Sequence, residues 1–318
     1  MSCCCTVTWA GYALLVWLAF RLFNTVRNIV YPYFIAAPIS DLVAFSGGKW
    51  AVVTGSTDGI GKAYATELAR KGFNIVLISR TQARLDSTKK EIEAVKSGVV
   101  VKTISYDFTD PSAEHYRQKI VSELDKLDIG VLVNNVGMSY DYPEKLTAVT
   151  GGLDVLSNIA VINTVPTTLM SAIALTQMAK RNKGVVINIS SGASYNQMSL
   201  WAVYSATKKY VDWLSAILRL EFVGTGIVIQ TVNPMLVATK MAQIKKTSFI
   251  APGPDQFARS ALRTVGIMNE TNGCFSHQIQ GEIAKLIPSI LLTPFLTKQS
   301  IGIRAKALRK REREAKDD

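Results

Sequence analysis

A tyrosine and a lysine four residues apart, Tyr204 and Lys208, are the pair in this sequence best suited to chemistry on a carbonyl group. On a helix, positions i and i+4 lie on one face, so the two side chains can act together. The ammonium is expected to favour the phenolate and to lower the tyrosine pKa from about 10 towards the working pH. Such a phenol suits proton transfer between a ketone and an alcohol. Among the eleven tyrosines, Tyr204 alone has a lysine at this spacing.

Two polar residues upstream complete a candidate catalytic group. The apolar run 184–189 predicts a strand, and Ser191 follows its carboxyl end, where ligands of open α/β sheets bind. The Ser191 hydroxyl can donate to a substrate carbonyl oxygen and hold it near Tyr204. Asn163 lies on a predicted helix. Its amide can either hold a water that connects Lys208 to solvent or make a simple contact with the backbone.

A glycine-rich turn near residue 55 has the context of a dinucleotide site. The apolar run 50–53 leads into this turn, and a helix is predicted from about 62 to 71. Strand, glycine turn and helix in this order place unpaired N–H groups of the helix N-terminus against the phosphates. The predicted cofactor-binding residues of the turn are Gly55, Ser56, Thr57, Asp58, Gly59, Ile60 and Gly61.

The end of the second predicted strand, 73–78, indicates which dinucleotide binds. Ser79 and Arg80 stand where an NAD site usually has a carboxylate for the ribose hydroxyls. A hydroxyl and a guanidinium suit a 2′-phosphate instead, so the sequence predicts NADPH. The alternative is that Arg80 merely begins the next loop.

Two further strand ends supply candidate cofactor contacts. Asp107 follows a strand predicted over 99–104, and its carboxylate can accept from the adenine amino group. Asn134 follows a strand predicted over 129–133. It can support the loop backbone or contact the cofactor, and the structural role is the firmer of the two.

Apolar segments near both ends of the chain indicate contact with a membrane. Residues 7–23 are apolar except for Arg21, which predicts an uncleaved anchor slightly shorter than a full span of about 20 residues. Arg21 and Arg27 come after most of this run, so the positive-inside rule places the following domain in the cytosol. The interrupted apolar stretch 279–303 predicts an interfacial helix, an arm over an apolar pocket, or a helix packed on the core.

Short apolar runs alternate with helical stretches from residue 47 to about 269, which predicts a Rossmann-like, doubly wound α/β domain with a parallel sheet. We expect three parts: a membrane anchor and linker over 1–46, a dinucleotide-binding catalytic domain over 47–270, and an apolar helical arm with a basic tail over 271–318. For His115 and His277 we expect surface or packing roles.

The 318 residues carry a formal net charge of +12, and seven cations crowd together after residue 303. This cluster suits an anionic membrane surface, or it is a solvated helix end. Nucleic acid is disfavoured because no nucleic-acid motif accompanies the charge. The spacing of the four cysteines indicates neither a metal site nor a disulfide framework.

These motifs together resemble the short-chain dehydrogenase/reductase family. The resemblance rests on Thr-Gly-x-x-x-Gly-Ile-Gly at 54–61, Asn-Asn-x-Gly at 134–137, Ser191 and Tyr-x-x-x-Lys at 204–208. The segments 188–192, 202–208, 237–240 and 271–273 are more narrowly similar to the microsomal very-long-chain 3-oxoacyl-CoA reductases. That group includes 17β-hydroxysteroid dehydrogenase type twelve and the nematode steroid dehydrogenases.

The resemblance implies roles for individual residues. Tyr204 would be the catalytic acid/base, with Lys208 as its partner and as a ligand of the nicotinamide ribose. Ser191 would orient the carbonyl, and Asn163 would complete a proton relay. The segment Pro234–Thr239 would lie over the nicotinamide.

The resemblance also implies NADPH-dependent reduction of a ketone on a long apolar substrate. Our first choice is 3-oxoacyl-CoA to 3-hydroxyacyl-CoA in very-long-chain fatty-acid elongation, and the second is a keto-steroid. The implied partners are that substrate, the endoplasmic reticulum membrane, other elongation enzymes and further copies of the chain, with the catalytic domain in the cytosol. A third hypothesis, a lipid-surface scaffold that binds NADPH without turnover, is disfavoured by the intact serine, tyrosine and lysine.

Overall fold

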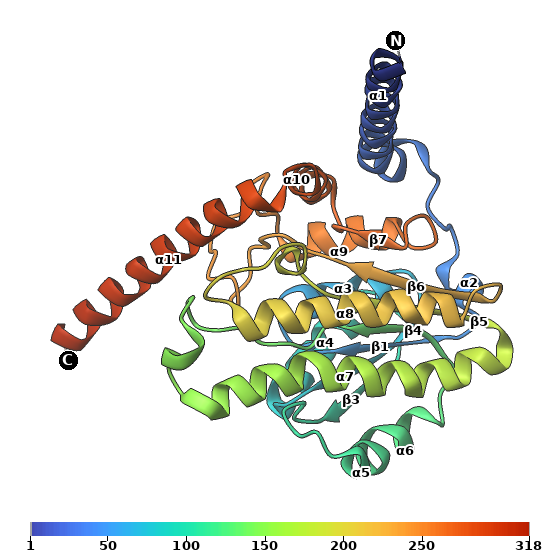
Figure 1. The fold of residues 1–318 in the computed structure, drawn as a ribbon. Coiled ribbons are helices and arrows are strands. Elements are labelled where there is room, and N and C mark those ends of the chain that lie inside the picture. Colours follow the sequence, from blue (N-terminus) through green and yellow to red (C-terminus); the bar gives the residue numbers. More distant parts are fainter. Residues whose placement is uncertain (1, 318) are drawn as a thin grey trace.

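A seven-stranded parallel sheet forms the centre of the protein (Figure 1). The computed structural model describes residues 2–317, and side chains are described for 7–315. The strand order is β3-β2-β1-β4-β5-β6-β7, so the chain reverses direction across the sheet after β3, as in doubly wound dinucleotide-binding folds. The strands are β1 Trp50–Thr54, β2 Asn74–Ser79, β3 Val101–Ser105, β4 Ile129–Asn134, β5 Lys183–Ile189, β6 Gly226–Val232 and β7 Glu270–Thr271. The predicted Rossmann-like α/β fold is confirmed.

Helices cover both faces of this sheet, which is why its central strands are nearly continuous apolar runs rather than alternating ones. One face is covered by α3, α4 and α9. The other is covered by the α5–α6 segment and α7, with α8 packed beside α7. These helices are α3 Gly59–Arg70, α4 Gln82–Glu93, α5 Ala113–Tyr116, α6 Ser122–Leu124, α7 Gly152–Arg181, α8 Ala202–Glu221 and α9 Pro254–Arg263, with the short α2 Leu42–Ser46 before β1.

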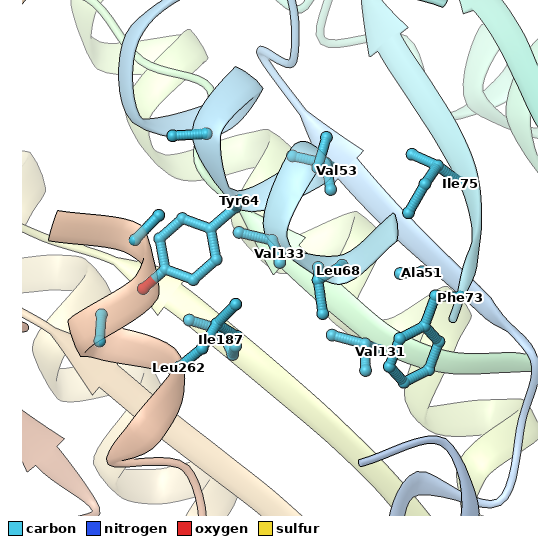
Figure 2. Close-up of a cluster of buried hydrophobic side chains, with 14 of the residues drawn as sticks. Ala51, Val53, Tyr64, Leu68, Phe73, Ile75, Val131, Val133, Ile187 and Leu262 are labelled. Carbon is cyan, nitrogen blue, oxygen red and sulfur yellow. The ribbon is translucent and has the colours of Figure 1, made fainter. Parts of the chain in front are cut away.

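The core under α3 shows how this packing positions the nucleotide turn. Tyr64 and Leu68 of α3 are fully buried against the sheet residues Val53 and Val133 and against Leu262 of α9 (Figure 2). The N-terminus of α3 is thereby fixed at the carboxyl end of β1. The helix begins three residues earlier than predicted because the Asp58 side chain accepts a hydrogen bond from the Gly59 N–H and caps it.

The terminal segments are long helices outside this layered core. Helix α1, Ser2–Val30, continues as a π-helical turn, Tyr31–Ile35, and stands away from the body (Figure 1). Within the described residues, two helices are long and apolar enough to cross a membrane: 7–35, which is almost wholly exposed, and α7, which is partly buried in the core. A membrane anchor is therefore compatible with α1, whereas α7 serves as a packing helix.

The predicted C-terminal arm is two helices, α10 Phe275–Leu286 and α11 Ser289–Asp317. The chain leaves the helical conformation at Ile287, because the residue before Pro288 is disfavoured in the helical region. The boundary predicted after residue 270 falls inside β7, so the last strand of the sheet extends one residue into the predicted arm.

Candidate active site

The first turns of α8 and the loop after β5 bring three predicted catalytic residues together. The Ser191 hydroxyl lies close enough to the Tyr204 phenol to lower the pKa of that phenol. The Lys208 ammonium lies 5.8 Å from the centroid of the Tyr204 ring and donates to the Ile189 carbonyl at 3.1 Å. The serine, the tyrosine and the lysine therefore form one group at the carboxyl end of β5.

The sequence-based expectation for the Tyr204 pKa is wrong. Burial raises the pKa of this phenol above its ordinary value, and the Ser191 hydroxyl opposes the rise only in part. Removal from water disfavours the charged phenolate, and this effect is larger than that of the Ser191 hydroxyl. The phenol is consequently protonated at neutral pH, which is the state that a proton donor requires.

Lys208 is buried, and the charge of an aspartate that we did not predict, Asp212, acts on it. Burial lowers the Lys208 pKa to about 8, while the carboxylate of Asp212 opposes this shift. Burial raises the Asp212 pKa in turn. One Asp212 oxygen accepts from the Asn233 amide at 3.4 Å. Asp212 lies four residues after Lys208 on α8, so the spacing rule that linked Lys208 to Tyr204 could also have found it.

Asn163 of α7 holds the loop that follows β4. Its side-chain oxygen accepts from the Met138 N–H at 3.0 Å, and its amide nitrogen donates to the Met138 carbonyl at 2.9 Å and to the Thr207 hydroxyl at 3.1 Å. These bonds support the backbone-contact alternative for Asn163. A Cβ atom on Gly137 would lie 2.6 Å from the Asn163 oxygen and 3.5 Å from the Lys208 nitrogen, so the amide borders the lysine. Its part in a proton relay stays a prediction.

The glycine-rich turn is packed closely against the loop after β4. Gly55 has φ +63°, and a Cβ atom there would lie 2.9 Å from the Cα atom of Val136. A Cβ atom on Gly61 would lie 2.3 Å from the Gly55 carbonyl oxygen, so both positions require glycine. The N-terminus of α3 consequently opens at this turn, where N–H groups can receive phosphate.

The other turn residues hold this conformation. Ser56 is buried and donates to the Ile78 carbonyl at 3.4 Å, and the Thr57 and Ser79 hydroxyls lie 3.1 Å apart. Ile60 is half-buried against the core. The turn is thus bonded to the end of β2, where the adenosine half of a dinucleotide is expected.

Arg80 and Asp107 form an ion pair at the carboxyl ends of β2 and β3. The Arg80 guanidinium, 73% exposed, lies 3.7 Å from a carboxylate oxygen of Asp107. The other Asp107 oxygen accepts from the N–H and the hydroxyl of Thr109. A solvent-facing guanidinium beside the Ser79 hydroxyl fits a 2′-phosphate, so the residues present fit NADP(H).

Asn134 points into the core instead of towards the predicted cofactor. Its amide donates to the Ser171 hydroxyl at 3.0 Å and to the side-chain oxygen of Asn188 at 2.8 Å. A side-chain contact with the cofactor therefore does not fit, and the bonds of Asn134 go to core side chains instead of to the loop backbone. The neighbouring Asn135 amide bonds the Thr54 and Gly55 carbonyls and braces the glycine turn.

The segment 234–250 connects the nucleotide turn with the catalytic serine. At one end the Pro234 carbonyl accepts from the Gly192 N–H at 2.8 Å. Further along, a Thr239 methyl lies 3.2 Å from the position of a Cβ atom on Gly59. The Lys240 ammonium lies 2.9 Å from the Asp58 carboxylate, a pair that the sequence reading missed. The segment thus spans the distance between the two halves of the site.

His277 of α10, for which we expected a packing role, bonds both ends of this segment. Its ring is fully buried. Nδ1 accepts from the Met235 N–H at 3.2 Å, and Nε2 lies 3.1 Å from the carbonyl oxygens of Leu236 and Ile250. Nε2 therefore carries the proton, and burial lowers the pKa of the imidazole, which stays neutral.

The loop 138–151, before α7, is also held by residues distant in the sequence. The Tyr140 hydroxyl accepts from the N–H of Val203, the residue before Tyr204. Four residues on, the Glu144 carboxylate is buried and paired with Arg304 of α11 through two bonds of 2.8 Å. The C-terminal helix is thereby attached to a loop that borders the catalytic tyrosine.

Comparisons with known proteins agree with this geometry. The profile of the short chain dehydrogenase family matches residues 49–248. A very-long-chain 3-oxoacyl-CoA reductase of Caenorhabditis elegans is 53% identical over 316 residues, 99% of each chain. A human very-long-chain 3-oxoacyl-CoA reductase is 39% identical over 307 residues, 95% of each chain.

A solved structure extends the likeness to the fold. A short-chain dehydrogenase from Sphingobium yanoikuyae in complex with NADPH is 28% identical, with a TM-score of 0.60, over 68% of this chain and 83% of its own. The family profile covers more than half of the chain, and the similarity to the nematode reductase runs along nearly all of it. The chain therefore belongs to the short-chain dehydrogenase family of oxidoreductases.

Proposed function

We propose that this protein is an NADPH-dependent reductase of very-long-chain 3-oxoacyl-CoA. The carrying observation is the group formed by Ser191, Tyr204 and Lys208 beside the glycine-rich turn. The likeness to the nematode reductase includes the anchor and the C-terminal arm, which supports the same substrate class. The exposed apolar face of α1 supports residence in the endoplasmic reticulum membrane, with the catalytic domain in the cytosol.

The chain's own residues account for the proton half of the reaction. When bound, NADPH supplies the hydride that the ketone carbon receives. The Ser191 hydroxyl donates to the carbonyl oxygen and holds it beside Tyr204. The phenol gives its proton to that oxygen as negative charge develops, and the C–O double bond becomes an alcohol. The Lys208 ammonium stabilises the phenolate that remains.

Preference for NADPH rests on the end of β2. Ser79 and Arg80 offer a hydroxyl and an exposed guanidinium. These groups bind a 2′-phosphate and leave the ribose hydroxyls of NADH without a carboxylate partner. A higher kcat/KM with NADPH than with NADH is the expected outcome, and replacing Arg80 by alanine should reduce that ratio.

The test is a comparison of rates with the full-length protein in detergent. It receives 3-oxoacyl-CoAs of increasing chain length and a panel of ketosteroids, each with NADPH and with NADH. We expect the highest kcat/KM for long 3-oxoacyl-CoA with NADPH. A ketosteroid turned over with higher kcat/KM than every acyl-CoA would overturn the substrate assignment. NADPH binding without any turnover would support the scaffold hypothesis instead.

The outer face of α7 and α8 supports a homo-oligomer. A shallow apolar hollow of about 420 Å³ lies there, and Trp213 and Leu220 are exposed on α8. The lining residues are Leu146, Thr164, Ala202, Val203, Ala206, Thr207 and Tyr210. Replacing Trp213 by glutamate should lower the mass measured by light scattering in detergent to that of a monomer.

A further inference from the structure

Large apolar side chains are exposed together at the junction of α10 and α11 and at the end of the segment 234–250. We call this surface the apolar rim; it comprises Phe249, Ile250, Leu286, Ile290, Leu291 and Phe295. Ile290 is 80% exposed and Phe249 is 67% exposed. Leu292, between Leu291 and Phe295 in the chain, is buried and fixes the start of α11 to the body. Grouped exposed side chains of this size mark a contact with a partner or a lipid phase.

The two parts of the rim are held together by α10. The Ile250 carbonyl lies 3.1 Å from Nε2 of His277 and accepts from the Gln280 amide at 3.4 Å. The end of the segment therefore rests on α10, about two turns before Leu286. Both parts of the rim are consequently attached to this helix.

Contacts with α1 give the depth of the rim relative to a membrane. The Arg21 guanidinium donates to the Lys285 carbonyl at 3.1 Å, and it lies 4.9 Å from the centroid of the Trp17 ring. Arginine and tryptophan are the residues that mark the boundary between lipid and water on a spanning helix.

The length of α1 agrees with this boundary. Its part before Arg21 is Ser2–Phe20, and at 1.5 Å per residue this is about 28 Å long, close to the hydrocarbon thickness of a bilayer. The C-terminal end of α10 thus lies at the membrane surface, beside the lower part of α1 (Figure 1). Leu286 and Ile290 directly follow that point in the chain.

The C-terminal end of α10 also lies close to the catalytic residues. The Lys285 ammonium lies 5.0 Å from the centroid of the Tyr195 ring, and Tyr195 is four residues after Ser191. On the segment side, Met235 contacts Gly192: its sulfur lies 2.3 Å from the position of a Cβ atom there. The residue before Leu286 of the rim and the start of the segment 234–250 therefore lie beside the loop that carries Ser191.

From these contacts we infer that the apolar rim inserts into the acyl-chain boundary of the cytosolic leaflet. A very long acyl chain reaches Tyr204 across the rim, directly from the bilayer, while the CoA group stays in water. This inference rests on the proposed function for its substrate, but the lipid contact itself is independent of catalysis. Burial of the exposed apolar side chains in lipid is the driving force.

The first experiment maps the lipid contact without any substitution. The full-length protein is reconstituted into phosphatidylcholine vesicles that contain a photoactivatable phosphatidylcholine with its reactive group on the acyl chain. Mass spectrometry should find lipid adducts on α1, on 286–295 and on 249–250, but none on 94–100, which border the opposite edge of the sheet. Adducts confined to α1 would overturn the inference.

The second experiment tests the path of the substrate. Ile290→Glu is compared in vesicles with Val100→Glu, which places the same charge at an exposed apolar position near β3. Ile290→Glu should lower kcat/KM for a very-long-chain 3-oxoacyl-CoA about tenfold and change kcat/KM for a four-carbon, water-soluble one by less than about twofold. Val100→Glu should change neither rate constant.

The outcomes separate the two proposals. Equal losses on long and short substrates in Ile290→Glu, or no loss on either, would overturn the acyl path. Wild-type protein that reduces no 3-oxoacyl-CoA would overturn the proposed function, while the lipid adducts would still decide whether the rim inserts.

Discussion

The two sides of the site are built in different ways. On the catalytic side, Ser191, Tyr204 and Lys208 lie within eighteen residues of one another and are fixed by one strand end and one helix. On the covering side, the segment 234–250 has little regular structure and depends on His277, a residue from α10. Chemistry therefore depends on local geometry here, whereas the enclosure of substrate and cofactor depends on contacts distant in the sequence. Substitutions on the two sides should consequently separate kcat from KM.

The largest effect is expected from Tyr204→Phe on the catalytic side. The ring and its packing remain, but the proton that the carbonyl oxygen requires is lost. We expect kcat to fall about a thousandfold, as for the loss of a general acid. The dissociation constant of NADPH, measured by fluorescence titration, should stay within about twofold of wild type because the segment 234–250 is untouched. A kcat within tenfold of wild type would show that another group donates the proton.

The next largest effect is expected on the pH dependence of activity when the carboxylate of Asp212 is removed. Asp212 favours the ammonium, whose pKa is about 8, so Asp212→Asn should move that pKa to a lower value. The ammonium form is then lost earlier as pH rises, and the alkaline fall of kcat/KM should move to lower pH. Activity near pH 6 should be nearly unchanged.

The pH dependence of kcat/KM checks this prediction, since it reports groups of the free enzyme. Asp212→Glu keeps the charge and serves as the matched control. A fall at the same pH in wild type and in Asp212→Asn would mean that Lys208 does not control the alkaline limb.

On the covering side, His277→Gln should raise KM for the acyl substrate several-fold with a smaller change in kcat. The substitution removes bonds to both ends of the segment and leaves Tyr204 in place. Losing buried hydrogen bonds should also lower the free energy of unfolding by about 1–3 kcal/mol, measured by urea titration. A drop in kcat without a rise in KM would contradict the division between the two sides.

The sign of the His277 pKa shift gives a further check. The folded protein keeps this imidazole neutral, because burial lowers its pKa below the ordinary value of 6.5. As pH falls below 6.5, this histidine binds a proton in the unfolded chain but not in the folded protein. The free energy of unfolding therefore decreases on acidification. Between pH 7.5 and pH 5.5 the loss should be smaller in His277→Gln than in wild type.

The smallest effect is expected from Lys240→Ala. Its ion pair with Asp58 is largely exposed, and such pairs contribute about 0–1 kcal/mol. The dissociation constant of NADPH should rise by no more than about fivefold, and added salt should reduce the difference from wild type. Asp58→Asn in the Lys240→Ala background should recover part of the affinity, because the unpaired carboxylate next to the phosphates is then gone.

The division between local and distant contacts also explains what could be predicted from the sequence. The glycine turn, the strand ends and the Tyr204–Lys208 pair are patterns within short stretches, and the fold and the catalytic group followed from them. His277 lies more than forty residues from Met235, and Arg304 lies 160 residues from Glu144, so no local pattern relates these partners. Their proximity is a product of tertiary packing.

Two residues show why side-chain environment could not be predicted. Asn134 is the last residue of its strand, so its side chain can turn either into the core or towards the nucleotide site beyond the strand end. The direction of the Tyr204 pKa shift depends on how much water reaches the phenol, which residue types and spacing do not report. In both cases the missing quantity is burial, which belongs to the folded chain as a whole.

The pairing of Arg304 with Glu144 makes the last helix part of the catalytic unit. If the chain were shortened ahead of position 304, a carboxylate shielded from solvent would lose its counter-charge and the loop beside Tyr204 would be pushed open. Truncations chosen to improve expression should therefore remove residues only beyond this arginine, and a protease that trims the exposed end would act as an inactivator once it passes that point.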